Sequence, residues 1–273
     1  MTTLLLTGAS GHLGKVLTKG LHDKGYHLRL TDIEPHDDVP EGVEFIRADT
    51  ADKTAMLAAC DGVDGIAHFG AISGESSFEN ILDANIRGTY HIYEGARRNK
   101  ARVVLATTNH TIGFHERTEH LEEDCQFRPD TFYGLSKAYG ELLGRYYWDK
   151  HGVESALLRI GSCFEKPSDV RQLSTWLSFN DLIELVDRCF AAPEMGCSVF
   201  WGVSANDRGW WSDHARELIG FEPQDNAEVF KDDVPSVLAD ADPVAERYQG
   251  GMFCAGDYTR AEPAPKNLFR TAS

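Results

Sequence analysis

The sequence predicts an α/β fold in which a doubly wound parallel sheet carries a small C-terminal lobe. Short apolar runs alternate with stretches of helical periodicity over the first 160 residues, a rhythm that is typical of right-handed crossover connections. A glycine cluster follows the first apolar run, at the point where such a sheet turns into its first helix. The 273 residues leave room for this sheet and one further lobe.

Each strand is expected where a short apolar run is bounded by turn residues. The expected strands span residues 3–7, 27–32, 43–47, 65–69, 102–107, 155–159 and 198–203. Each helix is expected where apolar residues recur at intervals of three and four. The expected helices span residues 12–24, 52–60, 79–99, 131–151, 178–191 and 212–219.

The pattern loosens after residue 160, which sets the expected division of the chain. Segment 221–250 looks loop-like and acidic, with eight Asp and Glu against two Lys and Arg. There is no repeat and no linker. We therefore expect one compact unit, with a Rossmann-type nucleotide-binding part at 1–160 and a smaller substrate-binding lobe at 161–273.

The charged residues are unbalanced towards acid. The chain holds 27 Lys and Arg against 43 Asp and Glu, a formal net charge of −16. Nucleic-acid binding and polybasic membrane attachment both need clustered cations, so we expect neither nucleic acid nor a membrane as a partner. An anionic ligand would need cations placed locally around it.

Three features favour a cytoplasmic protein. No apolar run approaches 18 residues, so no membrane span is expected. The N-terminal residues lack the basic and apolar regions of a signal peptide. The six cysteines are scattered without a CxxC pair, which favours reduced and mostly buried thiols.

Three histidines are regularly spaced but are not expected to bind metal. His110, His115 and His120 fall at intervals of five, which places neighbouring imidazoles on different faces of a helix or strand. No carboxylate pattern accompanies them. We expect hydrogen-bonded or solvated imidazoles and no metal site.

The N-terminal glycine motif indicates a dinucleotide site. Gly8, Gly11 and Gly14 form a GxxGxxG turn between the first strand and the first helix, with His12 and Leu13 inside it. Glycine is needed where the backbone turns sharply and approaches a pyrophosphate, and the helix N-terminus offers free N–H groups. A tight turn without a ligand is the alternative.

Two acidic residues are expected on the adenosine side of that site. Asp32 ends the second strand, 18 residues after Gly14, where its carboxylate can accept hydrogen bonds from ribose hydroxyls and repel a 2′-phosphate. No Arg or Lys lies at 31–36, so NAD is favoured over NADP. Asp49 is placed for the adenine amino group.

A Tyr-x-x-x-Lys pair is the candidate catalytic centre. The spacing of Tyr133 and Lys137 puts phenol and ammonium on one face of a helix. A nearby cation favours the phenolate, so we expect Lys137 to lower the pKa of Tyr133. A second copy, Tyr146 and Lys150, lies on another side of the helix and is interpreted as packing and solvated surface.

Thr108 and Asn85 complete the expected catalytic set. Thr108 follows a strand at the carboxyl edge, where ligands bind in open α/β sheets, and its hydroxyl can bind the substrate oxygen beside Tyr133. Asn85 lies in a long helix, where its amide can hold a water that relays protons from Lys137. A helix-packing role for Asn85 is the alternative.

These features together resemble the extended short-chain dehydrogenase/reductase family. More specific segments are similar to parts of uronate dehydrogenases. They are 107–113, 159–163, 173–176, 201–206, 210–211 and 248–251. One departure is Thr107-Thr108 where that family usually carries Ser-Ser, and threonine keeps the hydroxyl.

The resemblance implies an NAD-dependent oxidoreductase that oxidises D-glucuronate or D-galacturonate at C1 to an aldaro-1,5-lactone. It implies cofactor contacts beyond those above at Ile33, Thr50, Phe69, Gly70, Ala71 and Ile160, together with Tyr133 and Lys137. It implies substrate contacts at Ser73, Thr108, Asn109, His110, Ser162 and Arg171. A planar guanidinium at Arg171 suits a sugar carboxylate, and the alternative there is a surface charge.

Two other functions remain open from the sequence. A nucleotide-sugar epimerase or dehydratase shares the glycine and Tyr/Lys motifs, although it usually needs a larger C-terminal lobe. A non-catalytic NAD-sensing regulator is the second alternative, although such proteins tend to lose Tyr or Lys. The resemblance also implies a homo-oligomer, with a hexamer as one candidate state.

Overall fold

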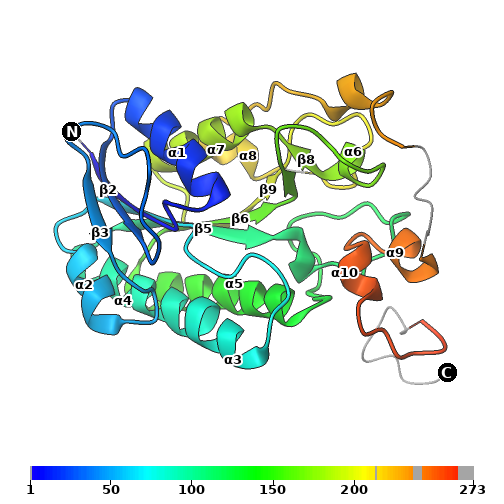
Figure 1. Ribbon diagram of the computed structural model, residues 1–273, viewed down its shortest axis with the longest axis horizontal. Helices are drawn as coiled ribbons and strands as arrows, with labels where there is room; N and C mark the ends of the chain where they lie inside the picture. The colour runs from blue at the N-terminus through cyan, green and yellow to red at the C-terminus, as the bar shows by residue number, and fades with distance from the viewer. Residues whose placement is uncertain (1, 213, 236–241, 264–273) are drawn as a thin grey trace.

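A seven-stranded parallel sheet forms the centre of the molecule, as the computed structural model of residues 2–212, 214–235 and 242–263 shows (Figure 1). Its strand order is β3-β2-β1-β4-β5-β6-β9, and every neighbouring pair is parallel. The strands are β1 (Thr3–Thr7), β2 (His27–Asp32), β3 (Glu44–Arg47), β4 (Gly65–His68), β5 (Arg102–Thr108), β6 (Ser155–Ile160) and β9 (Cys197–Gly202). The chain order reverses between β1 and β4, which confirms the doubly wound prediction.

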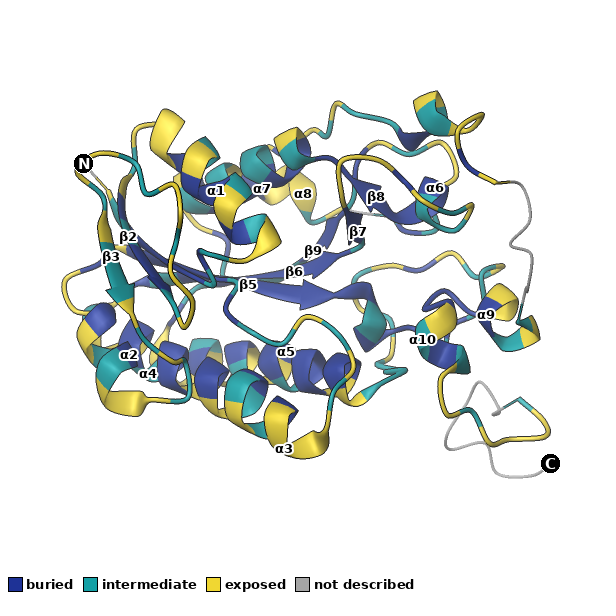
Figure 2. Ribbon diagram, in the orientation of Figure 1, coloured by how far each residue is buried: buried dark blue, intermediate teal, exposed yellow. Residues whose placement is uncertain are grey.

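Helices cover both faces of this sheet (Figure 1). One face carries α1 (His12–Asp23), α7 (Phe179–Ala191) and α8 (Arg216–Ile219). The other carries α2 (Lys53–Ala59), α4 (Gly88–Asn99) and α5 (Phe132–His151). The central strands β1, β4, β5 and β6 are buried, whereas the edge strand β3 is partly exposed (Figure 2). Two apolar clusters, one on each face, hold the layers together.

The predicted helix 79–99 is interrupted. The structure divides it into α3 (Phe78–Ile81), a π-helical turn at Leu82–Arg87 and α4. Asn85 lies in that turn, and its amide is hydrogen-bonded to the backbone of Ile72. A π-turn accommodates an extra residue where a side chain is held outside the regular helix, and such turns are frequent at functional sites.

The loop-like prediction for 221–250 is wrong in part. Ala227–Phe230 forms a 3₁₀ helix, and Pro243–Arg247 forms α9. Asp242 starts α9 by accepting hydrogen bonds from the N–H groups of Val244 and Ala245. One acidic residue of this segment thus acts as a helix cap. Residues 236–241 lie outside the described residues.

The boundary predicted at residue 160 falls inside the central sheet. Strand β9 pairs with β6 from Ser155 opposite Cys197 to Ile160 opposite Gly202. Helix α7 also packs against α1, where Gly20 leaves room for the side chain of Ile183. The central sheet and its helix layer therefore extend into the C-terminal part, which otherwise adds short elements. These are β7 (Ser162–Cys163), α6 (Gln172–Thr175), β8 (Trp176–Leu177) and α10 (Met252–Ala255).

All six cysteines are free thiols, and four of them are buried. Burial raises the pKa of Cys60 and of Cys163 to about 12, which keeps both as thiols at neutral pH. Among the described residues, no helix combines the length and the apolar character that a membrane span requires.

Candidate active site

A cavity of about 560 Å³ opens at the carboxyl ends of the strands. This is the edge where open α/β sheets bind ligands. Every residue that the sequence analysis assigned to the cofactor lines this cavity. They are Gly8, Gly11, His12, Leu13, Gly14, Asp32, Ile33, Asp49, Thr50, Phe69, Gly70, Ala71, Tyr133, Lys137 and Ile160.

The glycine turn forms one wall of this cavity. Gly8 has φ +71°, and a Cβ there would lie 2.6 Å from the backbone of Phe69 and Gly70. Gly11 caps α1 without a side-chain hydrogen bond, so the first N–H groups of the helix have no capping side chain. The backbone of this turn can approach a ligand closely, and the N-terminus of α1 offers free N–H donors. Both features fit the pyrophosphate of a dinucleotide.

Asp32 is held by two backbone donors where β2 ends at the cavity. Its carboxylate accepts from Ser10 N at 2.9 Å and from Glu34 N at 3.0 Å. Arg47 lies opposite Asp32 in the β2–β3 register, and its Nε donates to Ile33 O at 2.7 Å. This cation was not predicted, because Arg47 belongs to β3 and is distant from Asp32 in the sequence.

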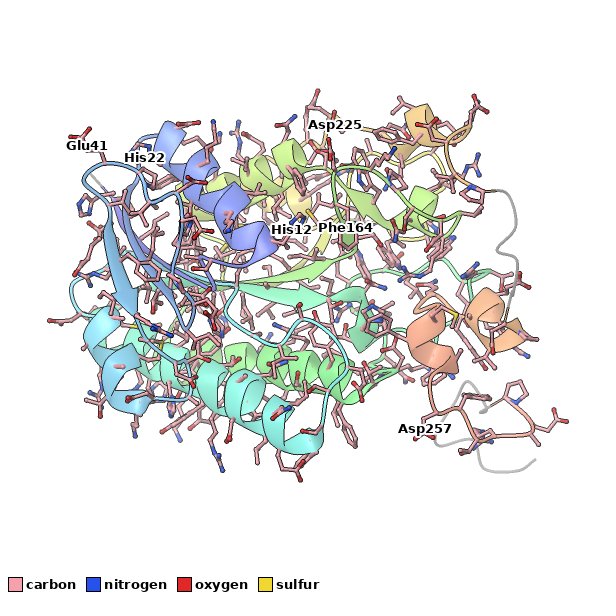
Figure 3. The ribbon with its side chains drawn as sticks, in the orientation of Figure 1. His12, His22, Glu41, Phe164, Asp225 and Asp257 are labelled. Atoms are coloured by element: carbon pink, nitrogen blue, oxygen red, sulfur yellow. The ribbon has the colours of Figure 1, made fainter. Side chains whose placement is uncertain are left out.

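His12 and Phe164 lie at another edge of the cavity (Figure 3). Their ring centroids are 6.0 Å apart, and His12 also contacts Phe179 edge-on at 5.3 Å. Phe164 was not predicted, since it follows β7 in a segment with no sequence motif. An aromatic contact here joins the start of α1 to the C-terminal part of the chain.

Helix α5 carries Tyr133 and Lys137 to the inner end of the cavity. The helix begins at Phe132, and the hydroxyl of Thr131 caps it by accepting from Gly134 N at 3.0 Å. The phenol of Tyr133 is hydrogen-bonded to the Thr108 side chain. Lys137 Nζ lies 5.8 Å from the Tyr133 ring centroid and donates to Ala106 O at 2.8 Å. The structure thus brings the predicted Tyr, Lys and Thr together.

The expected direction of the Tyr133 pKa is corrected by the structure. Burial raises the pKa of Tyr133 to about 12, and the Thr108 hydrogen bond offsets only part of this rise. Burial also lowers the pKa of Lys137 to about 8. Desolvation penalises both charged forms and therefore outweighs the attraction that helical spacing alone suggested.

Asn85 has a different set of partners from the one expected. Its Oδ1 accepts from Ile72 N at 2.9 Å, and its Nδ2 donates to Ile72 O at 3.1 Å and to Ser136 Oγ at 2.9 Å. The amide therefore fixes the loop at Ile72 against α5. The water relay stays a prediction, and both amide hydrogens are engaged elsewhere.

A buried histidine beneath the cavity was not predicted. His68 Nδ1 lies 2.7 Å from the hydroxyl of Thr7, and that hydroxyl accepts from Gly70 N at 3.0 Å. Burial, assisted by Lys137, lowers the pKa of His68 to about 3, so the imidazole is neutral. The pair fixes the Phe69–Ala71 segment of the cavity wall. The only sequence signal was a polar residue at the end of each of two apolar strands.

The residues assigned to the substrate fall into two groups. Ser73 and Thr108 line the cavity. The others, Asn109, His110, Ser162 and Arg171, are not among the residues that line it. Ser162 in β7 shares a hydrogen bond with the Thr175 hydroxyl at 2.9 Å. With its amide oriented so that both polar atoms are bonded, Asn109 accepts from Arg171 Nη2 at 2.9 Å.

His110 is oriented by a residue that sequence reasoning missed. Its Nδ1 lies 2.7 Å from Asp130 Oδ2, and the Asp130 side chain is fully buried. The imidazole stacks on Phe253 of α10, with ring centroids 4.0 Å apart. Asp130 immediately precedes the Thr131 cap of α5, a position that the sequence marks as a helix start and not as a histidine partner.

The second Tyr/Lys pair lies away from the cavity. Tyr146 contacts the rings of Tyr147 and His151 but is 48% exposed, so it packs only at the surface. Lys150 Nζ lies over its ring at 5.3 Å. The remaining two spaced histidines are also hydrogen-bonded, His115 to Gln126 O and His120 to Ser212 Oγ.

The site and fold together define a class of protein. Residues 4–177 match the NAD dependent epimerase/dehydratase family, and the chain belongs to it. Within it, the chain is 46% identical to uronate dehydrogenase of Agrobacterium fabrum, over 93% of this chain and 97% of that protein. It is also 46% identical to uronate dehydrogenase of Pseudomonas syringae, over 92% and 93% of the two chains.

Solved structures agree with these relatives. A tyrosine-to-alanine mutant of uronate dehydrogenase from Agrobacterium tumefaciens, complexed with NAD, has a TM-score of 0.89 at 45% identity, covering 93% of this chain and 97% of that one. Glucuronic acid dehydrogenase from Chromohalobacter salexigens has a TM-score of 0.90 at 40% identity over the same shares. The chain is accordingly an NAD-dependent oxidoreductase of the Rossmann type.

Proposed function

We propose that this protein oxidises D-glucuronate and D-galacturonate at C1 with NAD, forming the aldaro-1,5-lactone. The observation that carries the proposal is the meeting of two groups at one end of the cavity. Tyr133 and Thr108 line the cavity, and Asn109, the residue after Thr108, is hydrogen-bonded to the Arg171 guanidinium. The uronate dehydrogenases among the relatives support the same substrate class.

The residues present fit NAD, and their roles follow from their positions. The turn from Gly8 to Gly14 holds the pyrophosphate, and Asp32 holds the adenosine ribose. Lys137 holds the nicotinamide ribose. When bound, NAD supplies the hydride acceptor of the reaction. Asp49, which lines the same cavity, binds the adenine amino group in this proposal.

Tyr133 is the general base of the proposed reaction. Its phenolate takes the proton of the C1 hydroxyl while C1 loses a hydride, so that the C1–O bond becomes a carbonyl and the sugar becomes a lactone. The Thr108 hydroxyl binds the same substrate oxygen. Asn85 holds the cavity loop against α5 during this step.

The C-terminal part, residues 161–273, completes the substrate side. Arg171 pairs with the C6 carboxylate, because its planar guanidinium matches a carboxylate and further N–H groups remain after the bond to Asn109. Ser73, Asn109, His110 and Ser162 bind the sugar hydroxyls, which need several donors and acceptors. In a chain with a net charge of −16, these placed groups supply the local recognition of an anion.

We also propose that the protein acts as a homo-oligomer in the cytoplasm. On the outer face of α5, Phe132, Leu135, Leu142 and Tyr146 form an exposed apolar stripe at helical spacing. A second copy of α5 would present the same stripe, so a two-fold interface is self-complementary. Analytical ultracentrifugation of Leu142→Glu tests this, and an unchanged sedimentation coefficient in that variant would contradict it.

The deciding experiment is a substrate panel followed by NADH absorbance at 340 nm. We expect turnover with glucuronate and galacturonate and a preference for NAD over NADP. Turnover with neutral aldoses but with neither uronate would overturn the Arg171 assignment. Thermal stabilisation by a UDP-sugar would favour the epimerase alternative, and NAD binding without any turnover would favour the regulator.

A further inference from the structure

Gln249 is a fully buried side chain that joins the C-terminal segment to the loop before α5. Its Nε2 donates to Glu116 O at 3.1 Å and to Glu119 O at 2.9 Å. Its Oε1 accepts from Trp211 Nε1 at 2.8 Å, and its backbone N–H donates to His115 O at 2.8 Å. Because Gln249, Trp211 and His115 are buried and the two glutamate backbones are half-buried, displacing Gln249 would leave polar atoms without partners.

The backbone oxygen of Gln249 accepts from Arg171 Nε at 2.6 Å. Together with the Asn109 bond to Nη2, this contact fixes two of the three guanidinium nitrogens. A planar fork held at two nitrogens has a defined orientation, which bidentate recognition of a carboxylate requires. Arg117 holds the same segment on another side, donating to Ala245 O at 2.8 Å and to Tyr248 O at 3.2 Å.

The two glycines after Gln249 lie directly against substrate-side residues. A Cβ on Gly251 would lie 2.8 Å from Arg171 Cδ and 3.1 Å from Arg171 Nε. A Cβ on Gly250 would overlap the carboxylate of Asp130, the partner of His110. The absence of side chains at both positions therefore lets one turn touch Arg171 and the His110–Asp130 pair at once.

We propose that the turn Gln249–Gly251 is a positioning element that sets the orientation of Arg171 for the substrate carboxylate and supports Asp130 behind His110. The inference rests on the proposed function, since it gives the turn a role in binding a sugar acid. The three residues act through others and are not catalytic. They lie 78 or more residues from Arg171 in the sequence, so substrate recognition depends on the docking of the C-terminal segment.

Two glycine variants compare a Cβ that meets Arg171 with one that meets nothing. Gly251 has φ +63° and ψ −133°, and Gly220 has φ +62° and ψ +36°, where a Cβ meets nothing within 4 Å. Gly251→Ala therefore strains the turn itself and also displaces Arg171, whereas Gly220→Ala does neither to a comparable extent. We expect Gly251→Ala to raise the KM for glucuronate at least tenfold with the KM for NAD unchanged, and Gly220→Ala to leave both unchanged.

A double-mutant cycle tests whether the effect passes through Arg171. Arg171→Ala alone should raise the KM for glucuronate, and adding Gly251→Ala should raise it by less than twofold more, because the displaced group is already gone. Trp211→Phe is a milder variant, since it removes the hydrogen bond to Gln249 Oε1 and part of the indole that stacks on Trp201 but keeps an aromatic ring and the backbone of the turn. We expect it to raise the glucuronate KM about threefold.

The outcomes distinguish this inference from the function on which it rests. If the wild-type protein oxidises no uronate, the proposed function fails. If it does, and Gly251→Ala behaves like Gly220→Ala, the positioning role is wrong. The positioning role would also be overturned if Gly251→Ala raised the KM values for NAD and glucuronate equally. It would likewise be overturned if the effects of Gly251→Ala and Arg171→Ala on the glucuronate KM were fully additive. Should Gly251→Ala not fold, an unchanged glucuronate KM in Trp211→Phe would overturn the inference alone.

Discussion

Asn109 connects Arg171 to the strand that ends beside the cofactor cavity. Its Oδ1 accepts from Arg171 Nη2 at 2.9 Å, while its Nδ2 donates to Ile160 O at 3.2 Å. Ile160 is the last residue of β6 and lines the cavity. The side-chain amide of Asn109 thus links the Arg171 guanidinium to the end of β6, at the cavity that Tyr133 also lines.

Asn109→Ala should weaken sugar-acid binding without affecting the cofactor. The change removes a hydrogen bond to a charged group, which contributes roughly 1.5–3 kcal/mol, so a rise of about tenfold or more in the glucuronate KM is expected. Steady-state kinetics with each substrate varied in turn measure this. A matching rise in the KM for NAD would contradict the assignment of Asn109 to the substrate side.

Tyr133→Phe should lower kcat by at least about 10²-fold, because it removes the general base and keeps the ring. Tyr146→Phe is the matched control, since it alters the second Tyr/Lys pair on the same helix, outside the cavity. Calorimetric titration with NAD checks that Tyr133→Phe still binds the cofactor. Near-normal turnover in Tyr133→Phe would exclude it as the base.

Asp32→Ala should relax the preference for NAD. The carboxylate repels a 2′-phosphate, and Arg47 lies opposite it in the β2–β3 register. We expect the NADP-to-NAD ratio of kcat/KM to rise about tenfold, a change of about 1.4 kcal/mol. Adding Arg47→Gln should reverse part of the gain. A ratio that does not move in Asp32→Ala would remove this residue from the ribose.

Much of the fold follows from local sequence patterns. The predicted bounds of the first two strands, 3–7 and 27–32, coincide with β1 and β2, because an apolar run between turn residues is a local signal. The glycine motif could also be predicted locally, because an apolar strand pattern precedes it and a helical pattern follows it. By contrast, helix 79–99 is divided, because the partner of Asn85 is a backbone group of Ile72.

The parts of the site that could not be predicted depend on contacts between distant segments. Asp130 is recognisable as a partner of His110 only when the loop before α5 folds back over β5. Gln249 reaches Arg171 across 78 residues. Burial raises the pKa of Tyr133, although the helical spacing of Lys137 suggested a lowered pKa. Burial depends on how the whole site packs, so it could not be predicted from local spacing.

The pH dependence of oxidation should follow the two buried groups at the centre of the site. Burial raises the pKa of Tyr133 to about 12, so the phenolate fraction, and with it kcat, rises as pH rises from 6. Lys137 has its pKa lowered to about 8. Above that pH it loses the positive charge that favours the phenolate, so the rise should flatten near pH 8.

Lys137→Arg tests the origin of that flattening. A guanidinium keeps its charge beyond pH 12, so the profile of this variant should continue to rise above pH 8 even if its absolute rate is lower. Lys150→Arg makes the same exchange on the exposed pair and should keep the wild-type profile. A wild-type rate that is constant between pH 6 and 8 would contradict deprotonation of Tyr133 as the pH-dependent step, and flattening that persists in Lys137→Arg would assign it to a group other than Lys137.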